Sequence, residues 1–458
     1  MLTPLDARVS DRNAEALGIP VRNLMGNAGK EVARVLDEEY QGKKVLFVCG
    51  SGNNGGDGFA AALGMDPARV SVALLCEPSK IHTDESRFYY SLLECDISQY
   101  SRDLIDGCDV IADCALGTGT SGNVKGPYRS FIEDANASGK PILSVDVPSG
   151  LGTDMAIVPD RTVTFMDIKE GMDQSNSGHI TVADIGIPYA AYRDVGPGDM
   201  LRYPIPKKDS HKGQNGRLMV IAGGPYFGAP ALASYSALRT GADIVRLFSP
   251  ESVHAEVSSM TPVLMVTDLP GDRLTTTSVG MLLSNSKDYD AVLIGPGLGT
   301  SDDTMEAVRE FVSNCDVPMV IDADGLTALS GHRLSAPAVL TPHRGEFERL
   351  GGGNPEDIAR MMGVTVLLKG ADDTITNGMV TRTNRHGTAA MTGAGTGDVL
   401  AGCVAALLSK GLSPFDSACL GAYICGKAGE LAFQSKSYGL IATDVAESIP
   451  DVLREGLR

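Results

Sequence analysis

Two hydrophobic patterns alternate along the chain. Short runs of consecutive apolar residues are followed by segments in which apolar residues recur at helical spacing. A short continuous run is typical of a strand buried on both faces of a parallel sheet, so the alternation predicts an α/β fold with parallel sheets. The runs that predict strands are 44–49, 70–75, 110–113, 141–146, 217–222, 243–248, 291–295, 317–322, 338–341 and 364–368. The segments that predict helices include 1–40, 231–240 and 399–408.

The domain organisation follows from length and from one atypical segment. Residues 194–213 are rich in proline, glycine and charge and lack apolar periodicity, which is typical of a linker. Because 458 residues exceed the usual size of one domain, we expect two domains, residues 1–205 and residues 206–458. Each is predicted to be a three-layer αβα domain, and the first is expected to be Rossmann-like.

Composition excludes several classes of partner. The formal net charge is −18, so the chain lacks the basic face that nucleic acid or an anionic membrane requires. The nine cysteines form no C-x-x-C pair, which indicates free thiols in a reducing compartment. The first residues lack the apolar core of a signal peptide, and no apolar run approaches the ~20 residues of a membrane span. We therefore expect a soluble, cytoplasmic protein with no nucleic-acid or membrane partner.

A glycine-rich stretch, residues 387–402, carries the strongest chemical signal in the second half. Small residues run up to Gly397, Asp398 follows, and an apolar helical run begins at Val399. Backbone N–H groups in such a loop, together with the positive end of the next helix, create a site for a phosphate. Asp398 at its mouth is placed to take a proton from a hydroxyl that attacks this phosphate. The alternative is a glycine-rich turn in which Asp398 only caps the helix.

Carboxylates also follow strands in the first half. Asp57 lies in the glycine-rich loop after the first strand, and Asp113 and Asp146 end two later strands. In an open parallel sheet all such ends lie on one edge, so the three side chains are expected to share a crevice. Any one of them alone is more often a helix cap, but the three together predict a site.

Motifs in the first half carry a family resemblance. GNNGGDG (52–58), DCALGTG (113–119) and SVDVPSG (144–150) resemble the signatures of the YjeF amino-terminal family, the NAD(P)HX epimerases. Lys169 and residues 177–188 are similar to the closing segment of that family. The resemblance covers nearly all of the first domain.

This resemblance implies roles for individual residues. It implies a K⁺ ion held by Asn54, Asp113 and Ser149, whose oxygens suit a hard cation. Asp146 is the expected acid–base residue of an epimerase, and Lys169 is a second candidate whose alternative is a surface lysine. The residues implied to bind substrate are Asn53, Asn54, Gly55, Gly56, Asp57, Gly117, Thr118, Gly119, Thr120, Ser121, Gly122, Asn123, Tyr128 and Asp146.

Motifs in the second half resemble the ribokinase-like superfamily, so a ribokinase-like αβα domain is expected there. They are DADG (322–325), KG (369–370) and AGTGDVLAG (394–402). Three further motifs are similar to those of the NAD(P)HX dehydratases within that superfamily. They are HKGQNG (211–216), GPGLG (295–299) and TPHRGE (341–346).

The second resemblance implies that ADP, with Mg²⁺, is the phosphate donor. The residues implied to bind the nucleotide are Lys369, Gly370, Ala371, Asp372, Asp373, Gly395, Thr396 and Gly397. The residues implied to bind the hydrated coenzyme are Ala229, Gly299, His343 and Asp398. His343 has an alternative as a structural histidine after a strand. Asp398 is expected to be the catalytic base.

Together the two halves imply a repair enzyme for the hydrated coenzymes NADHX and NADPHX, and a homo-oligomer is expected from the family. Hydroxide is a poor leaving group, whereas a phosphorylated hydroxyl leaves readily, so a kinase-like site can drive dehydration to NAD(P)H with AMP and phosphate as products. A dehydratase handles one stereoisomer, and an attached epimerase makes the other usable. The alternative is a kinase for a small vitamin alcohol whose amino-terminal domain is a non-catalytic binding module.

Overall fold

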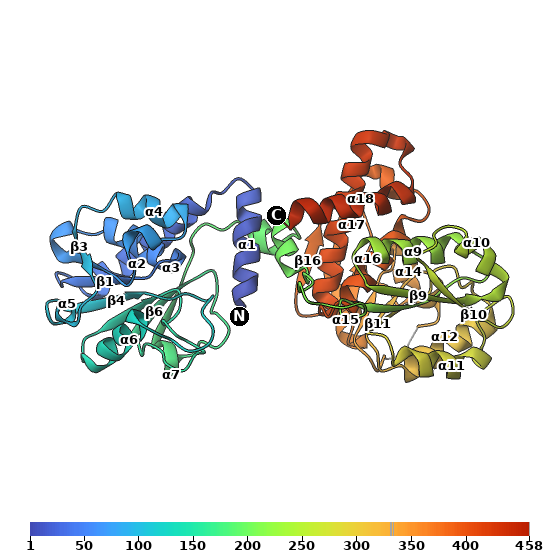
Figure 1. The fold of residues 1–458 in the computed structure, drawn as a ribbon, viewed down its shortest axis with the longest axis horizontal. Coiled ribbons are helices and arrows are strands. Elements are labelled where there is room, and N and C mark those ends of the chain that lie inside the picture. Colours follow the sequence, from blue (N-terminus) through green and yellow to red (C-terminus); the bar gives the residue numbers. More distant parts are fainter. Residues whose placement is uncertain (330–331, 333, 458) are drawn as a thin grey trace. The chain divides into compact units, whose positions relative to one another are not determined.

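A computed structural model describes residues 1–329, 332 and 334–457. The chain divides into two compact units, residues 1–191 and residues 192–458 (Figure 1). Each unit contains one sheet with helices on both of its faces. The predicted α/β class with two αβα units is therefore confirmed.

The first unit is built on a seven-stranded parallel sheet with the order β3-β2-β1-β4-β5-β6-β7. The order reverses between β1 and β4, and the loops after two such strands separate to leave a crevice. The strands are β1 Val45–Cys49, β2 Val70–Leu74, β3 Asp96–Gln99, β4 Val110–Cys114, β5 Ile142–Val145, β6 Arg161–Phe165 and β7 His179–Ala183.

Both faces of this sheet are buried. Val45, Phe47 and Cys49 of β1 belong to one apolar cluster, and Leu46 and Val48 belong to another on the opposite face. Helices therefore cover both faces. The helices are α1 Pro4–Ala16, α2 Val21–Glu39, α3 Asn53–Leu63, α4 Asp84–Ser91, α5 Arg102–Asp106, α6 Pro127–Ala137, α7 Gln174–Ser177 and α8 Tyr189–Arg193, with 3₁₀ turns η1 Pro67–Arg69 and η2 Pro78–Lys80.

The second unit is built on a nine-stranded sheet with the order β10-β9-β8-β11-β12-β13-β14-β15-β16. The strands from β10 to β14 are parallel, and β15 and β16 extend the sheet as an antiparallel edge. The strands are β8 Arg217–Ile221, β9 Ile244–Pro250, β10 Met265–Leu269, β11 Ala291–Ile294, β12 Met319–Ile321, β13 Ala338–Leu340, β14 Thr365–Leu368, β15 Asp373–Thr376 and β16 Thr381–Asn384.

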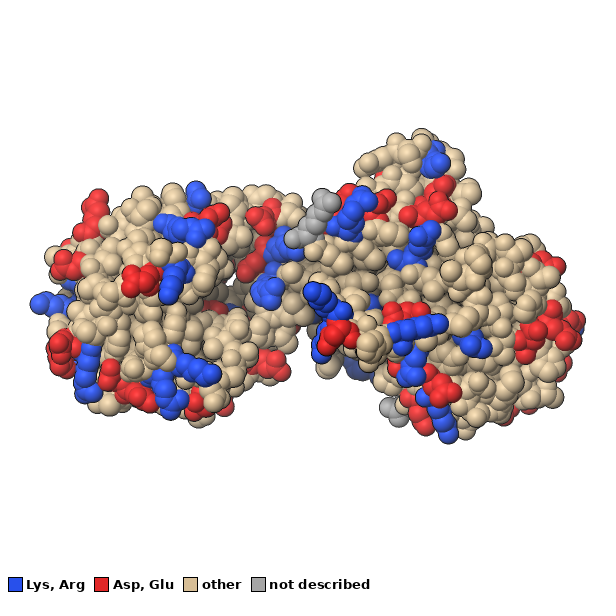
Figure 2. Space-filling model, viewed as in Figure 1, with Lys and Arg blue, Asp and Glu red and all other residues tan. Residues whose placement is uncertain are grey.

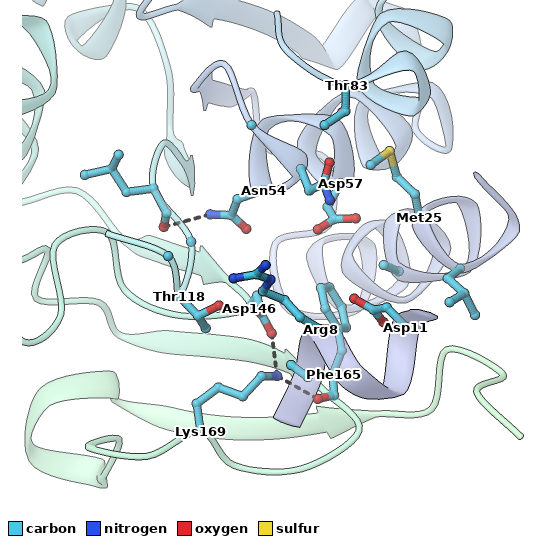
Figure 3. Close-up of a pocket in the computed structure, with 18 of the residues that line it drawn as sticks. Arg8, Asp11, Met25, Asn54, Asp57, Thr83, Thr118, Asp146, Phe165 and Lys169 are labelled. Atoms are coloured by element: carbon cyan, nitrogen blue, oxygen red, sulfur yellow. Dashed lines mark hydrogen bonds and ion pairs between the residues drawn. The ribbon is translucent and has the colours of Figure 1, made fainter. Parts of the chain in front are cut away.

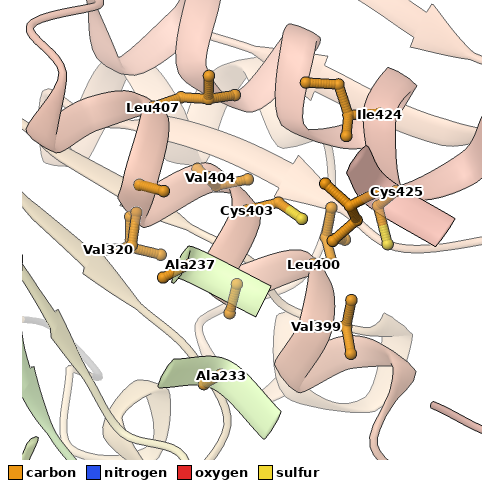
Figure 4. Close-up of a cluster of buried hydrophobic side chains, with 14 of the residues drawn as sticks. Ala233, Ala237, Val320, Val399, Leu400, Cys403, Val404, Leu407, Ile424 and Cys425 are labelled. Carbon is orange, nitrogen blue, oxygen red and sulfur yellow. The ribbon is translucent and has the colours of Figure 1, made fainter. Parts of the chain in front are cut away.

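Helix α16 (Thr396–Ser409) is the centre of the packing on one face of this sheet. Its residues from 399 to 409 are all buried, and it lies against α9 and α17 (Figure 4). The other helices are α9 Gly228–Arg239, α10 His254–Ser258, α11 Thr276–Ser286, α12 Asp302–Asn314, α13 Asp324–Thr327, α14 Arg344–Arg349, α15 Pro355–Met362, α17 Pro414–Lys436 and α18 Ala442–Gly456. The 3₁₀ turns are η3 Pro197–Arg202, η4 Glu251–Val253, η5 Ala389–Thr392 and η6 Ser437–Gly439.

The segment between the predicted domains differs from the expected linker. The buried Arg382 guanidinium donates a 2.9 Å hydrogen bond to the buried carboxylate of Asp199, and the Tyr203 hydroxyl donates one of 2.9 Å to the Thr240 carbonyl. These contacts hold η3 against the second unit. The predicted limit between residues 205 and 206 thus falls inside that unit, and the linker prediction is wrong for the residues of η3.

Charged side chains of both signs are scattered over the face of the molecule seen in Figure 2. Lys and Arg alternate with Asp and Glu over the visible surface of each unit (Figure 2). Among the described residues, no helix has both the length and the apolar character needed to span a membrane.

The approach of α16 to α9 depends on a glycine. A methyl group on Gly402 would lie 2.0 Å from the Ser236 hydroxyl and 2.1 Å from the Ala233 carbonyl oxygen, which is backbone. We expect Gly402→Ala to lower the free energy of unfolding by ~2 kcal/mol, because the two helices must separate. Gly280→Ala is the control, since Gly280 lies in α11 with open space around it and should gain up to ~1 kcal/mol from helix propensity. Denaturant unfolding measures both, and equal stability of the two variants would contradict this account of the packing.

Candidate active sites

A cavity of about 500 Å³ opens in the first unit at the switch point of its sheet (Figure 3). The loop after β1 and the loop after β4 form two of its walls, and Asp146, just after β5, lies between them and Lys169. The predicted residues that line it are Asn53, Asn54, Asp57, Gly117, Thr118, Gly119, Thr120, Tyr128, Asp146 and Lys169.

Asp146 and Lys169 form a buried ion pair in this cavity. The Lys169 ammonium lies 2.6 Å from Asp146 Oδ1, and it also donates to the Thr164 hydroxyl at 2.9 Å and to the Phe165 carbonyl at 2.7 Å. Lys169 is only 4% exposed. The alternative of a surface lysine is therefore wrong.

Backbone strain places the Asp146 side chain. Asp146 has a φ of 63°, and Met166, which lines the same cavity, has a φ of 67°. Such left-handed conformations cost about 1 kcal/mol or more for residues other than glycine and cluster at functional sites. The Asp146 N–H is held by the Val163 carbonyl at 2.8 Å, so the sheet itself fixes the turn.

Two more carboxyl groups line the cavity without a cation of their own. Burial raises the pKa of Asp57 well above its usual value, and the nearby Asp146 and Asp11 raise it further. Burial, followed by the charge of Asp146, also raises the pKa of Asp11 to about 6. The charge of Lys169 lowers both pKa values by a smaller amount, because its ammonium is in an ion pair with Asp146. Proton-donating and proton-accepting carboxyl groups therefore coexist in one cavity.

Asp113 does not reach the cavity, so the expectation that it shares the crevice with Asp57 and Asp146 is wrong. It is 0% exposed and accepts hydrogen bonds from Ser144 Oγ at 2.8 Å and from the Ser149 N–H and Oγ at 2.9 and 2.5 Å. Its position within β4, one residue before the strand ends, turns the side chain into the protein.

Several oxygen atoms lie close to this buried carboxylate. Asn54 Oδ1 is buried and has no hydrogen-bond partner, while Asn54 Nδ2 donates to the Leu116 carbonyl at 3.0 Å. Ser149 Oγ lies 3.3 Å from the same carbonyl and bonds to Asp113. A buried carboxylate next to an unsatisfied amide oxygen fits a bound cation.

The remaining predicted residues of the first unit lie beside the cavity rather than in its lining. A methyl group on Gly55 would lie 2.2 Å from the Gly50 carbonyl oxygen, and one on Gly56 would lie 2.3 Å from the Ser86 hydroxyl. Both glycines therefore allow close packing of α3. The other three, which follow on the same loop as Thr120, are Ser121, Gly122 and Asn123.

A second cavity, of about 430 Å³, lies in the second unit beside the amino end of α16. The predicted nucleotide residues that line it are Lys369, Gly370, Ala371, Asp373, Thr396 and Gly397. Gly395 lies just outside, where its φ of 94° begins α16, and Asp372 instead forms an exposed ion pair with Arg385. This cavity runs between the antiparallel edge of the sheet and α17.

Lys369 and Asp398 meet at this amino end. The Lys369 ammonium lies 2.9 Å from Asp322 Oδ1, which also accepts a 2.8 Å hydrogen bond from the Thr341 hydroxyl. A methyl group on Gly397 would lie 3.3 Å from the same ammonium, so the lysine reaches the first turn of α16. Burial, and next the charge of Asp322, raise the pKa of Asp398 in that turn to about 7. A carboxyl group with this pKa is suited to exchange a proton at neutral pH.

The other predicted hydrate-binding residues, which are Ala229, Gly299 and His343, lie outside the lining of the second cavity. The Gly299 N–H donates a 2.9 Å hydrogen bond to Asp324, whose charge also raises the pKa of Asp398. Ala229 is in the first turn of α9, after the loop that follows β8. His343 caps α14, because its Nδ1 accepts hydrogen bonds from the N–H groups of Gly345 at 3.0 Å and Glu346 at 3.3 Å. It therefore has the structural role that the sequence left open, and its exposed ring leaves substrate contact as a prediction.

Comparisons with known proteins decide the family. A family profile described as NAD(P)H-hydrate dehydratase matches residues 218–451, and one described as YjeF-related protein N-terminus matches residues 21–171. A protein of Pyrobaculum aerophilum named bifunctional NAD(P)H-hydrate repair enzyme Nnr is 39% identical over 99% of this chain and 98% of its own length. The chain belongs to the family of bifunctional NAD(P)H-hydrate repair enzymes. The resemblance drawn from the motifs is confirmed.

Solved structures support the fold of this repair enzyme. A ribokinase-like superfamily protein of Enterococcus faecalis matches with a TM-score of 0.52 and 23% identity, covering 58% of this chain and 96% of its own. An ADP/ATP-dependent NAD(P)H-hydrate dehydratase of Bacillus subtilis, crystallised with ATP and Mg²⁺, matches with a TM-score of 0.50 and 24% identity, covering 57% and 98%. These likenesses confirm the ribokinase-like fold.

Several lining residues of the repair enzyme were missed by the sequence analysis. Arg8 and Asp11 line the first cavity from α1, which has no glycine loop or strand end to signal it. The second cavity has further lining residues at the end of β16, in the segment that follows it, in α16 and in α17, and the apolar pattern of these two helices indicates only core helices. They are Asn384, His386, Gly387, Thr388, Ala389, Met391, Thr392, Leu400, Ala422, Cys425 and Gly426.

Proposed function

We propose that this repair enzyme restores hydrated nicotinamide coenzymes in two steps. The first unit interconverts the two epimers of NADHX and NADPHX. The second unit dehydrates one epimer to NAD(P)H at the expense of ADP, with AMP and phosphate as products. The observation that carries the proposal is Asp398, a carboxyl group with a pKa of about 7 in the first turn of α16, beside the cavity that holds Lys369.

Dehydration needs a better leaving group than hydroxide. The Asp398 carboxylate removes the proton of the hydrate's hydroxyl, the hydroxyl oxygen attacks the terminal phosphoryl group of ADP, and the bond from that group to AMP breaks so that AMP leaves. Backbone N–H groups from Ala394 to Gly397 stabilise the charge on that phosphoryl group, as expected at a helix amino end. The ring nitrogen then expels phosphate by forming the C=N bond, and loss of a proton from the neighbouring carbon restores NAD(P)H.

The nucleotide would occupy the second cavity, with its phosphates toward Lys369. Among the described residues, no three His, Cys, Asp or Glu side chains are grouped to hold a metal ion. This fits Mg²⁺, which is usually held by substrate phosphates and waters with one or two carboxylates. When bound, it would neutralise phosphate charge. Asp322 and Asp324 are the nearby carboxylates that could complete its coordination.

Epimerisation requires the hydroxyl to leave and return on the other face of the ring. Asp146 is the proposed base, because the ion pair with Lys169 keeps a negative charge at a fixed point in the cavity. The loop of residues 117–120 would bind the rest of the dinucleotide through backbone N–H groups and hydroxyls. Lys169 is a positioning residue for Asp146, since its ammonium donates hydrogen bonds to Asp146, to the Thr164 hydroxyl and to the Phe165 carbonyl.

K⁺ is proposed to bind at Asn54, Asp113 and Ser149. The unsatisfied Asn54 Oδ1 and the buried Asp113 carboxylate are the observations that support it. When bound, the ion would balance the Asp113 charge and order the loop that begins at Leu116.

The dehydratase assay tests the function directly. With hydrated NADH and ADP, we expect absorbance at 340 nm to recover, with kcat/KM rising through a pH of about 7 as Asp398 becomes ionised. Asp398→Asn should lower the rate at least ~100-fold and leave epimerisation intact. A stable phosphorylated product without recovery of the absorbance would favour the vitamin-alcohol kinase instead.

Asp146→Asn is the reciprocal variant. We expect it to lower the enzyme-catalysed rate of epimerisation at least ~100-fold, after the spontaneous rate has been subtracted, because it removes the base. Dehydration of the usable epimer should be unchanged. Chromatographic separation of the two epimers over time measures the first rate. Epimerisation at the wild-type rate would mean that the first unit is a binding module or uses another base.

Dependence on K⁺ tests the cation site. We expect exchange of K⁺ for tetramethylammonium to lower the epimerisation rate at least ~10-fold and to lower the melting temperature of the first unit, since Asp113 loses its partner charge. Ser149→Ala should raise the K⁺ concentration needed for half of the effect. Dehydration, measured in the same buffers, is the control. An epimerisation rate and a melting temperature that are the same in K⁺ and in tetramethylammonium would contradict the assignment.

A further inference from the structure

Helix α1 is fixed as a wall of the first cavity. Before it, the Leu2 N–H donates to the Ile168 carbonyl at 3.0 Å and the Glu170 N–H donates to the Leu2 carbonyl at 2.9 Å, which bridges the amino end to the segment of Lys169. Near its other end, Asn13 Nδ2 donates to the Ala191 carbonyl at 3.0 Å. The face between these anchors turns Arg8 and Asp11 toward the cavity (Figure 3).

Asp11 is unusual among the acidic residues of this helix. Asp6 caps the helix by bonding to Thr3, whereas the Asp11 carboxyl group has no hydrogen bond or ion pair with another described residue. It faces Asp57 from α3 and Asp146 from beyond β5. An uncompensated carboxyl group beside two others destabilises the fold, so its presence is better explained by function than by stability.

The other charged and titratable groups around Asp11 do not neutralise it. Lys169 is held by Asp146, Thr164 and the Phe165 carbonyl. Arg8 is exposed and forms no ion pair within the described chain, and Tyr128 lines the same cavity from α6.

We propose that Asp11 is a catalytic acid of the epimerase and works together with Asp146 as the base. The proposal rests on the epimerase function proposed above. The two carboxyl groups reach the cavity from different elements, α1 and the turn after β5. A ring bound between them can therefore exchange a proton with one carboxyl group on each of its faces.

The step balances without an additional reactant. Neutral Asp11 gives its proton to the hydroxyl on the ring carbon next to nitrogen, and the C–O bond breaks with its electron pair on the departing water. The nitrogen lone pair forms a C=N bond. Water then adds to the opposite face, the C=N electrons return to nitrogen, and the surplus proton passes to the Asp146 carboxylate. One proton has moved from Asp11 to Asp146, and exchange with solvent restores both groups.

The environment of Asp11 supports this role. Burial and the charge of Asp146 raise its pKa to about 6, so the protonated form is present in weakly acidic and near-neutral solution and is lost as the pH rises. The acid-dependent part of the rate should therefore decline above a pH of about 6.

The test uses the full chain without ADP, so that only epimerisation is observed. Interconversion of the two NADHX epimers is followed from pH 5 to 9 for the wild type, Asp11→Asn and Asp6→Asn. We expect Asp11→Asn to be ~100-fold slower near pH 5.5 and to lack the decline with rising pH. Its melting temperature should stay equal or rise, because a like-charge contact is removed. Asp6→Asn, the matched control, should lower the melting temperature but keep the shape of the pH profile.

The outcomes separate the two proposals. A wild type that fails to epimerise would overturn the function itself. An Asp11→Asn protein that keeps the declining limb would overturn the role of Asp11, and so would loss of that limb in Asp57→Asn alone. If Asp11→Asn melts at a lower temperature, Asp11→Glu decides, because it must restore the limb if the carboxyl group is the acid.

Discussion

Each unit depends on one ion pair between a lysine and an aspartate at the carboxyl edge of its sheet. Lys169 pairs with Asp146 at 2.6 Å, and Lys369 pairs with Asp322 at 2.9 Å. A buried ammonium stabilises only the carboxylate that it touches, so the neighbouring carboxyl groups remain without a partner in a poorly solvated place. Burial, followed by the negative charge of the paired aspartate, raises the pKa of Asp398 in one unit and of Asp11 in the other.

The same edge also carries residues with a strained backbone. Asp146 and Ala323 both adopt positive φ directly after, or two residues after, a buried parallel strand, and Ala323 lies between two of the acidic residues near Asp398. Strain of this kind persists only where well-packed strands fix the residues before it. The apolar β5 and β12, buried along their whole length, provide that support. Packing in the core is thus what holds the chemical groups in place.

Apolar central strands could be predicted from sequence, whereas the Thr-rich central strand β6 and the edge strands could not. Strands buried on both faces, such as β1 and β8, are continuous apolar runs that leave a clear pattern. Strand β3 is exposed throughout, and β16 consists of four polar residues on an antiparallel edge, so neither has that pattern. The turn η3 was missed for a related reason. Its Asp199 is polar yet buried, and the arginine that pairs with it, Arg382, lies far along the chain.

The sequence alone determined the α/β class, the central strands, the glycine loops and the family, because these depend on local patterns and on motifs of a few consecutive residues. Tertiary structure alone decided that Lys169 is buried, that Asp113 turns away from the cavity and that Asp11 enters it. The physical reason is that charge and burial depend on what lies across a cavity. A polar helix with aspartate on one face has the same pattern whether that face meets water or, as in α1, two other carboxyl groups.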